Sequence, residues 1–274
     1  MNVFISVDME GVAGVSHVKQ AMRGEDDYPA ARKLMIGETN GAIEGAFDGG
    51  ATKVVVNDSH GDMYNLIPEE MDERAELIIG SPKTAGSMMQ GLGDGFDVAL
   101  FVGYHAGPGV EAAVLDHVYS GRNFYDVRIN GASMTETELN ALLAGTYGVP
   151  LGLVTGDDKI CAHVEKTIPG VRTVVVKEAF GRHVAQSIHP RRARAAIREG
   201  AREAVAGAGE LQPYRIDGPF ALELDTRTSL VAELCALAPG VIRTGGRTVR
   251  FESADFREVF RCLVAWMYLA VDAP

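Results

Sequence analysis

The chain has 274 residues, of which 46% are hydrophobic and 23% charged, a composition typical of a folded globular protein rather than a disordered or fibrous one. Its formal net charge of -11 argues against a nucleic-acid partner, because phosphate contacts require clustered Lys and Arg. No apolar run approaches the ~20 residues that a membrane-spanning helix requires, so we expect no membrane partner.

The cysteines and the first residues of the chain bear on its compartment. Cys161, Cys235 and Cys262 are far apart in apolar surroundings, which predicts reduced, buried thiols. The chain begins without a basic segment and reaches Asp8 too soon for a signal peptide. We therefore expect a cytoplasmic protein.

The first predicted element is a strand over residues 3–7, which are mostly β-branched or aromatic and are followed by Gly11. If the strand continues through its tip, its two-residue period places Asp8 and Glu10 on one face. Two adjacent carboxylates require a cation, an Arg or Lys, or a shared proton. No base lies within the motif, so a metal is the leading interpretation. The alternative, in which the two acids begin a loop or cap the next turn, stays open.

The next segments alternate between helix and strand. A helix is predicted from Pro29 to the Gly49-Gly50 pair, and it is followed by a buried strand over residues 53–57. Strand, helix and strand form a right-handed parallel unit. Further strands are predicted at residues 77–79, 98–102, 151–154 and 171–176. The predicted fold class is therefore α/β, with an open, mostly parallel sheet and helices on both faces.

The pattern changes near residue 210. Upstream, residues 123–130 look extended, Asn130-Gly131 predicts a turn, and helices are expected at 134–147 and 191–206. Downstream, short strands and two helices predict a smaller α+β region. We therefore expect an α/β metal-binding catalytic domain over residues 1–210 and a smaller α+β region over residues 211–274.

Three predicted strands bring polar side chains to one edge of the sheet. Ligands of open parallel sheets bind beyond the carboxyl ends of the strands, where the first strand delivers Asp8 and Glu10. The strand after it delivers His60, and the strand ending at Val102 delivers His105. Each histidine alone is more typical of a structural residue, but four such groups at one edge indicate a metal site. Mixed carboxylate and imidazole ligands suit zinc, with manganese or cobalt as replacements.

Two further residues are ambiguous from pattern alone. Ser133 and Glu136 have the spacing of a capping box at a helix start, and that interpretation is favoured for Glu136. His117 lies in a glycine-rich loop over residues 107–121, where it is either a mobile catalytic group or an exposed loop residue.

Taken together, these motifs resemble the bacterial zinc D-aminopeptidases of the dipeptide-transport operon type. The resemblance covers most of the chain, and its motifs are residues 6–11, 57–60, 103–106, 136–141 and 156–158. It implies a two-zinc centre with Asp8 as the bridge, and therefore favours a ligand role for Glu136 over the capping role, although the residue could serve both purposes. The implied ligands are Asp8, Glu10, His60, His105 and Glu136. His117 matches the catalytic histidine of the family, as either general base or nucleophile.

The resemblance also implies an activity and an assembly. The activity is metal-dependent removal of the N-terminal residue from short peptides, including peptides that contain D-residues. The family forms homo-oligomeric rings, described as decamers, whose active sites face an inner channel. The sequence departs from the family over residues 107–116 and at Glu138, which bears on substrate preference.

Two rival functions stay open at the level of sequence. One is a metallohydrolase of another bond, such as an amidase or a phosphoesterase. A phosphoesterase needs a basic clamp near the strand ends, and Lys53 lies at the wrong end of its strand. The other rival is a non-catalytic, metal-stabilised binding protein, in which His117 would be dispensable.

Overall fold

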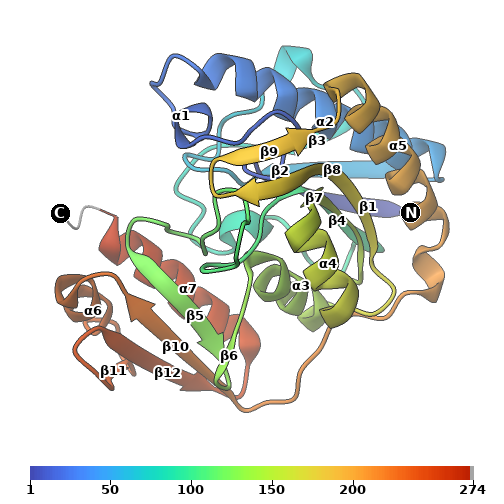
Figure 1. Cartoon of the computed structure of the whole chain (residues 1–274). Helices are drawn as coiled ribbons and strands as arrows, with labels where there is room; N and C mark the ends of the chain where they lie inside the picture. Colours follow the sequence, from blue (N-terminus) through green and yellow to red (C-terminus); the bar gives the residue numbers. More distant parts are fainter. Residues whose placement is uncertain (272–274) are drawn as a thin grey trace.

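A seven-stranded sheet forms the centre of the computed structural model, which describes residues 1–271 (Figure 1). Its strand order is β3-β2-β1-β4-β7-β8-β9, and all neighbours are parallel except β8 and β9. The strands are β1 (Asn2–Val7), β2 (Lys53–Asp58), β3 (Ala75–Ile78), β4 (Val98–Tyr104), β7 (Leu151–Asp157), β8 (Arg172–Gly181) and β9 (Val184–Ser187). The predicted open parallel sheet is confirmed.

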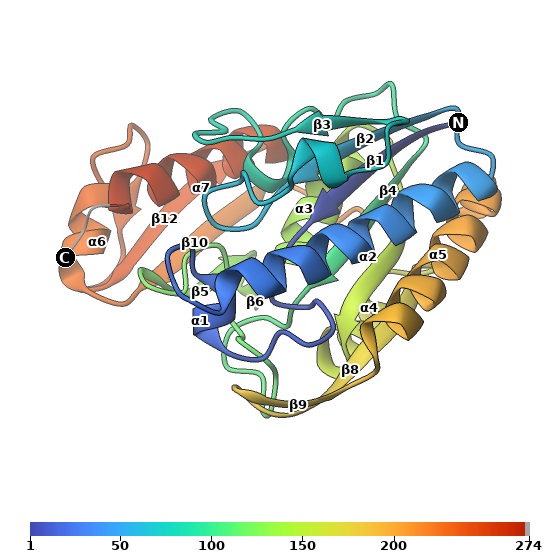
Figure 2. The same cartoon turned by 90° about the horizontal axis from the view of Figure 1, so that it is seen from above.

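Helices cover both faces of this sheet. Side chains alternate along β1, so that Val3 and Ile5 join one hydrophobic core while Phe4 joins the other. Figure 2 shows α2 and α5 side by side on the first face, and α3 and α4 belong to the second core. These helices are α2 (Tyr28–Asp48), α3 (Glu136–Thr146), α4 (Asp158–Thr167) and α5 (Pro190–Ala206). The predicted α/β fold class is therefore confirmed.

A second, antiparallel sheet lies beside the first, with strand order β11-β12-β10-β5-β6 (Figure 1). Its elements are β5 (Phe124–Ile129), β6 (Ala132–Ser133), β10 (Phe220–Thr226), α6 (Ser229–Cys235), β11 (Ile242–Arg243), β12 (Thr248–Ser253) and α7 (Phe256–Ala270). The predicted turn joins β5 to β6, with positive φ at Asn130 and Gly131. β5 and β6 come before residue 210 in the chain, whereas β10, β11 and β12 come after it. The domain boundary proposed near residue 210 stays a prediction.

The remaining elements are short. They are α1 (Val18–Ala21) and the 3₁₀ helices η1 (Pro68–Glu70), η2 (Ser87–Met89) and η3 (Ala208–Glu210). Cys161, Cys235 and Cys262 are buried and free, as predicted. Within residues 1–271, none of the helices combines the length and the apolar character needed to cross a lipid bilayer.

The backbone segments that leave β1 and β4 touch each other. β1 ends at Val7, so the strand does not continue to Glu10, and that part of the sequence-based interpretation is wrong. Instead the chain turns, and Gly11 N–H donates to the carbonyl of Gly103 over 2.7 Å. A Cβ atom at Gly11 would collide with the carbonyl oxygen of Tyr104, and Gly103 has a φ of +72°. This close crossing brings Asp8 next to His105.

Candidate metal centre

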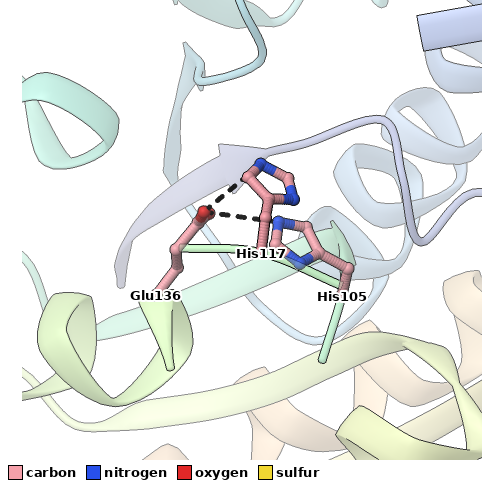
Figure 3. A group of neighbouring side chains, drawn as sticks. All are labelled: His105, His117 and Glu136. Atoms are coloured by element: carbon pink, nitrogen blue, oxygen red, sulfur yellow. Dashed lines mark ion pairs between the residues drawn. The ribbon is translucent and has the colours of Figure 1, made fainter. Parts of the chain in front are cut away.

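Six side chains converge at the carboxyl edge of the large sheet. They form two groups of three, and within each group the potential ligand atoms lie within 4.8 Å of one another. The first group is Asp8, Glu10 and His60, and the second, drawn in Figure 3, is His105, His117 and Glu136. The structure therefore brings together every site residue predicted from the sequence.

The first group is arranged around the imidazole of His60. Its Nε2 lies 2.6 Å from the carbonyl oxygen of Ala21, which fixes the ring proton on that nitrogen in the neutral form. The other nitrogen, Nδ1, lies 3.1 Å from Asp8 Oδ1 and 2.9 Å from Glu10 Oε2. A nitrogen lone pair and two carboxylate oxygens thus face one point. A backbone carbonyl that orients a histidine in this way is typical of metal ligands.

The second group repeats the arrangement with His105. Its Nδ1 lies 2.9 Å from the carbonyl oxygen of Ala106, while its Nε2 lies 3.4 Å from both Asp8 Oδ2 and Glu136 Oε1. Glu136 Oε1 also accepts a hydrogen bond from Tyr119 N–H over 2.5 Å. Because the two oxygens of Asp8 face different histidines, Asp8 lies between the two groups.

His117 lies on the accessible side of the second group. Its ring stacks on His105 with centroids 4.0 Å apart, and its Nε2 lies 3.7 Å from Glu136 Oε1 (Figure 3). Its Nδ1 lies 2.8 Å from the carbonyl oxygen of Leu115, which leaves Nε2 as the free nitrogen. The His117 side chain is 19% exposed, whereas that of His105 is 1% exposed. His117 is therefore the imidazole most open to a substrate.

The loop that carries His117 is tied down at several points. Val114 N–H donates to Asp157 over 3.0 Å, and Leu115 N–H donates to the carbonyl of Arg182 over 3.0 Å. The Arg182 side chain also pairs with Asp116. Glycine content alone suggested a mobile loop, but these contacts hold the histidine in place. Asp157, which also caps α4, is a positioning residue that lies in a family motif of the sequence but was assigned no role there.

The start of α3 differs from the sequence-based expectation. Thr135, not Ser133, is the N-cap, and its capping-box partner is Glu138. Thr135 Oγ1 accepts from Glu138 N–H over 3.1 Å, and Glu138 Oε2 accepts from Thr135 N–H over 2.9 Å. The capping box predicted for Ser133 and Glu136 is therefore wrong by two residues, because Ser133 belongs to β6. Glu136 is left free to face the centre, and the unexpected Glu138 has a structural role.

The donor set fits a bound metal. Within residues 1–271, Asp8 Oδ2, Glu10 Oε2 and His105 Nε2 are buried atoms without a hydrogen-bond partner. Ligands held at about 2.0–2.2 Å in a tetrahedron lie about 3.3–3.6 Å from one another. The separations of 3.4 Å around His105 agree with that spacing and are long for hydrogen bonds.

Burial and neighbouring charges shift the pKa values of the acidic and basic side chains of the centre. Burial raises the pKa of Asp8 to about 7, and the negative charge of Glu10 adds to this effect. Burial lowers the pKa of His105, but the Glu136 and Asp8 carboxylates outweigh it and raise that pKa to about 10. The centre therefore favours positive charge, and a divalent ion would compete there with protons.

A buried lysine supports the segment that carries Glu10. Lys177 is 1% exposed, and its ammonium group donates to the carbonyls of Glu10, Val12 and Val15. These bonds fix the turn after β1, although burial lowers the pKa of Lys177 to about 8. Sequence reasoning missed this residue, because a single lysine at the end of a strand carries no signal of burial.

Comparisons with known proteins show the family to which the chain is similar. The model of peptidase family M55, described as D-aminopeptidase, matches residues 1–265. The D-aminopeptidase of Bacillus subtilis (strain 168) is 35% identical over 275 residues, which cover 99% of this chain and 98% of that protein. A solved structure, the Zn-dependent D-aminopeptidase DppA from Bacillus subtilis, a self-compartmentalizing protease, has a TM-score of 0.94 and 34% identity. That match covers 100% of this chain and 99% of the other.

Family model, sequence identity and fold agree over nearly the whole length of the chain. The resemblance inferred from the strand-end motifs is thus confirmed. The chain belongs to the M55 family of D-aminopeptidases and is a peptide hydrolase.

Proposed function

We propose that this protein is a zinc-dependent aminopeptidase that removes the N-terminal residue, including a D-residue, from short peptides at a two-zinc centre. The observation that carries the proposal is the pair of ligand groups joined by Asp8. The similar solved protein is described as Zn-dependent, which supports zinc over manganese or cobalt. The number of ions and the role of each residue are our proposal.

The ligands fall into two sets that share one residue. Glu10 and His60 would hold one ion, His105 and Glu136 would hold the other, and Asp8 would contribute one oxygen to each. When bound, two such ions polarise a carbonyl, lower the pKa of a water molecule and stabilise developing negative charge. The free amino group of the substrate would bind one of the ions or a carboxylate of the centre.

The proton transfer would be made by His117. Leu115 holds its Nδ1–H, so its Nε2 is free to accept a proton and to return it to the departing amine. The residue lines a cavity of about 120 Å³ together with Asp8, Glu10, His60 and Glu136. Its position beside the ligands, on their more exposed side, supports a catalytic role over a bystander role.

The rival phosphoesterase function lacks support from the cavity. None of the described residues that line it is Lys or Arg. Lys53 lies at the start of β2 and pairs with Glu76 over 3.0 Å. Buried Lys83 donates to Asn57 Oδ1 over 2.7 Å instead of facing the centre. The described residues that line this inner cavity thus supply no basic clamp for a phosphate.

A matched substrate panel tests the function. The protein, stripped with a chelator and then supplied with zinc, should hydrolyse D-aminoacyl dipeptides only after zinc is added. D- and L-aminoacyl amides and a phosphate monoester complete the panel. Zinc-dependent release of phosphate without release of amino acids would contradict the proposal, as would zinc binding without turnover of any substrate.

We further propose that the chain acts in the cytoplasm as a homo-oligomeric ring, which would admit short peptides and exclude folded proteins. The similar solved protein is described as self-compartmentalizing, and the three free cysteines suit a reducing compartment. Light scattering should return a mass several times the 29.3 kDa of one chain. A mass near 29.3 kDa would contradict the ring.

A further inference from the structure

A larger cavity adjoins the metal centre. It has a volume of about 510 Å³ and shares Glu10, His60 and Gly61 with the inner cavity. This volume lies within the range of about 300–1,000 Å³ typical of small-ligand sites. Apolar side chains of α1 and the following residue, Val18 and Met22 among them, form part of its wall. The outer cavity is therefore the natural place for the part of a peptide that follows the scissile bond.

The two cavities differ in the charged side chains that line them, since among residues 1–271 only the outer one has arginines. The inner end carries three buried carboxylates, from Asp8, Glu10 and Glu136, whose charge the two proposed zinc ions would offset. The outer cavity is lined by two arginines, Arg23 and Arg122, and by the carboxylates of Glu10 and Asp62. A short peptide that places its free amino group at the inner end would leave its C-terminal carboxylate in the outer cavity.

One of the two arginines is already engaged. Arg23 donates to the carbonyl of Tyr64 over 3.0 Å, approaches Asp62 to 3.4 Å and lies 3.9 Å from the centre of the Tyr64 ring. Within residues 1–271, the guanidinium of Arg122 makes no hydrogen bond, ion pair or ring contact. Arg122 is thus the arginine that is free to bind a ligand.

The backbone around Arg122 is nevertheless held on both sides. The carbonyl of Gly121 accepts from Arg227 Nε over 2.8 Å, and Asn123 Nδ2 donates to the carbonyl of Ala270 over 2.7 Å. Arg122 also follows His117 closely in the chain, so the two side chains are placed by one segment. A fixed backbone with a free, forked guanidinium suits bidentate recognition of a carboxylate.

We propose that Arg122 binds the C-terminal carboxylate of the peptide substrate and so selects very short peptides. The inference rests on the proposed aminopeptidase function and extends it to a second recognition site. Peptides whose carboxylate reaches Arg122 while their amino end lies at the centre gain this contact, and longer or amidated peptides lose it.

Two substrates that differ only at the carboxylate test the inference. D-alanylglycine and D-alanylglycinamide should be compared for the zinc-loaded wild type and for Arg122→Ala. The ratio of kcat/KM for the dipeptide to that for its amide should fall about 10- to 100-fold in the variant, the usual range for charge-assisted hydrogen bonds. The change should come mainly from KM, because the contact is the same in ground and transition states. Arg122→Lys should give an intermediate ratio.

Arg192→Ala is the matched control, since it removes an exposed positive charge on α5 and should keep the wild-type ratio. An unchanged ratio in Arg122→Ala would overturn the inference. Calorimetric binding of the two compounds gives a second readout that does not depend on turnover. If neither compound is hydrolysed but only the dipeptide loses affinity in Arg122→Ala, the proposed function fails and the carboxylate site stands.

Discussion

Replacing His117 with alanine should lower kcat by about 10²- to 10⁴-fold while the metal content stays at the wild-type level. The expected size is that of a positioned acid-base group, and the free Nε2 beside Glu136 gives the geometric reason. Steady-state kinetics and elemental analysis of the same preparation measure the two quantities together. Circular dichroism establishes that the variant is folded.

His163→Ala is the matched control for the loss of a partly exposed imidazole. His163 lies on α4, where its Nε2 is 3.0 Å from Glu138 Oε2 rather than beside the proposed ligands. This variant should keep nearly full turnover. If His117→Ala also keeps it, His117 is a bystander, and if His117→Ala loses metal, His117 is a ligand.

The second large effect is expected from Asp8→Asn. The wild-type chain should contain about two zinc ions, and the variant should lose both, because one Asp8 oxygen faces each ligand group. Loss of the ions removes several kcal/mol of transition-state stabilisation, so activity should fall by about 10³-fold or more. Elemental analysis of protein purified without chelator gives the zinc content.

Glu136→Gln separates a shared ligand from an unshared one. Glu136 belongs to only one of the two groups, so this variant should keep about one ion, held by Asp8, Glu10 and His60. The two variants would then differ in stoichiometry and not only in activity. Equal retention of one ion in both variants would show that Asp8 is not the bridge.

The sequence predicted the edge at which the centre forms. Asp8, His60 and His105 follow three strands that are parallel and adjacent, and a parallel sheet brings the ends of such strands together. This prediction was possible because the residue pattern that marks each strand is local in the sequence. The orientation of the two imidazole rings could not be predicted in the same way. The carbonyl that holds His60 comes from Ala21 at the end of α1, and the carbonyl that holds His105 comes from Ala106 in the segment after β4, and no periodic pattern in the sequence places either of them.

Other features depended on contacts between distant parts of the chain. The capping box was placed two residues early because both Ser133 and Thr135 have a glutamate three residues later, and only pairing of Ser133 in β6 decides between them. The structural role of Lys177 depends on the position of β8 beside the turn after β1, which the sequence does not show. The free side chain of Arg122 likewise depends on what lies around it in space.

The pairing of β5 with β10 also affects the order in which the centre forms during synthesis of the chain. The bond between Arg128 and Asp225 joins residues 97 apart, which is roughly 5 to 20 seconds of synthesis. During that interval Asp8, Glu10 and His60 have already been synthesised. The strand β5, whose flanking segments carry His117 and Glu136, still lacks its partner strand β10. We therefore expect the nascent chain to lack a complete centre until β10 has been synthesised.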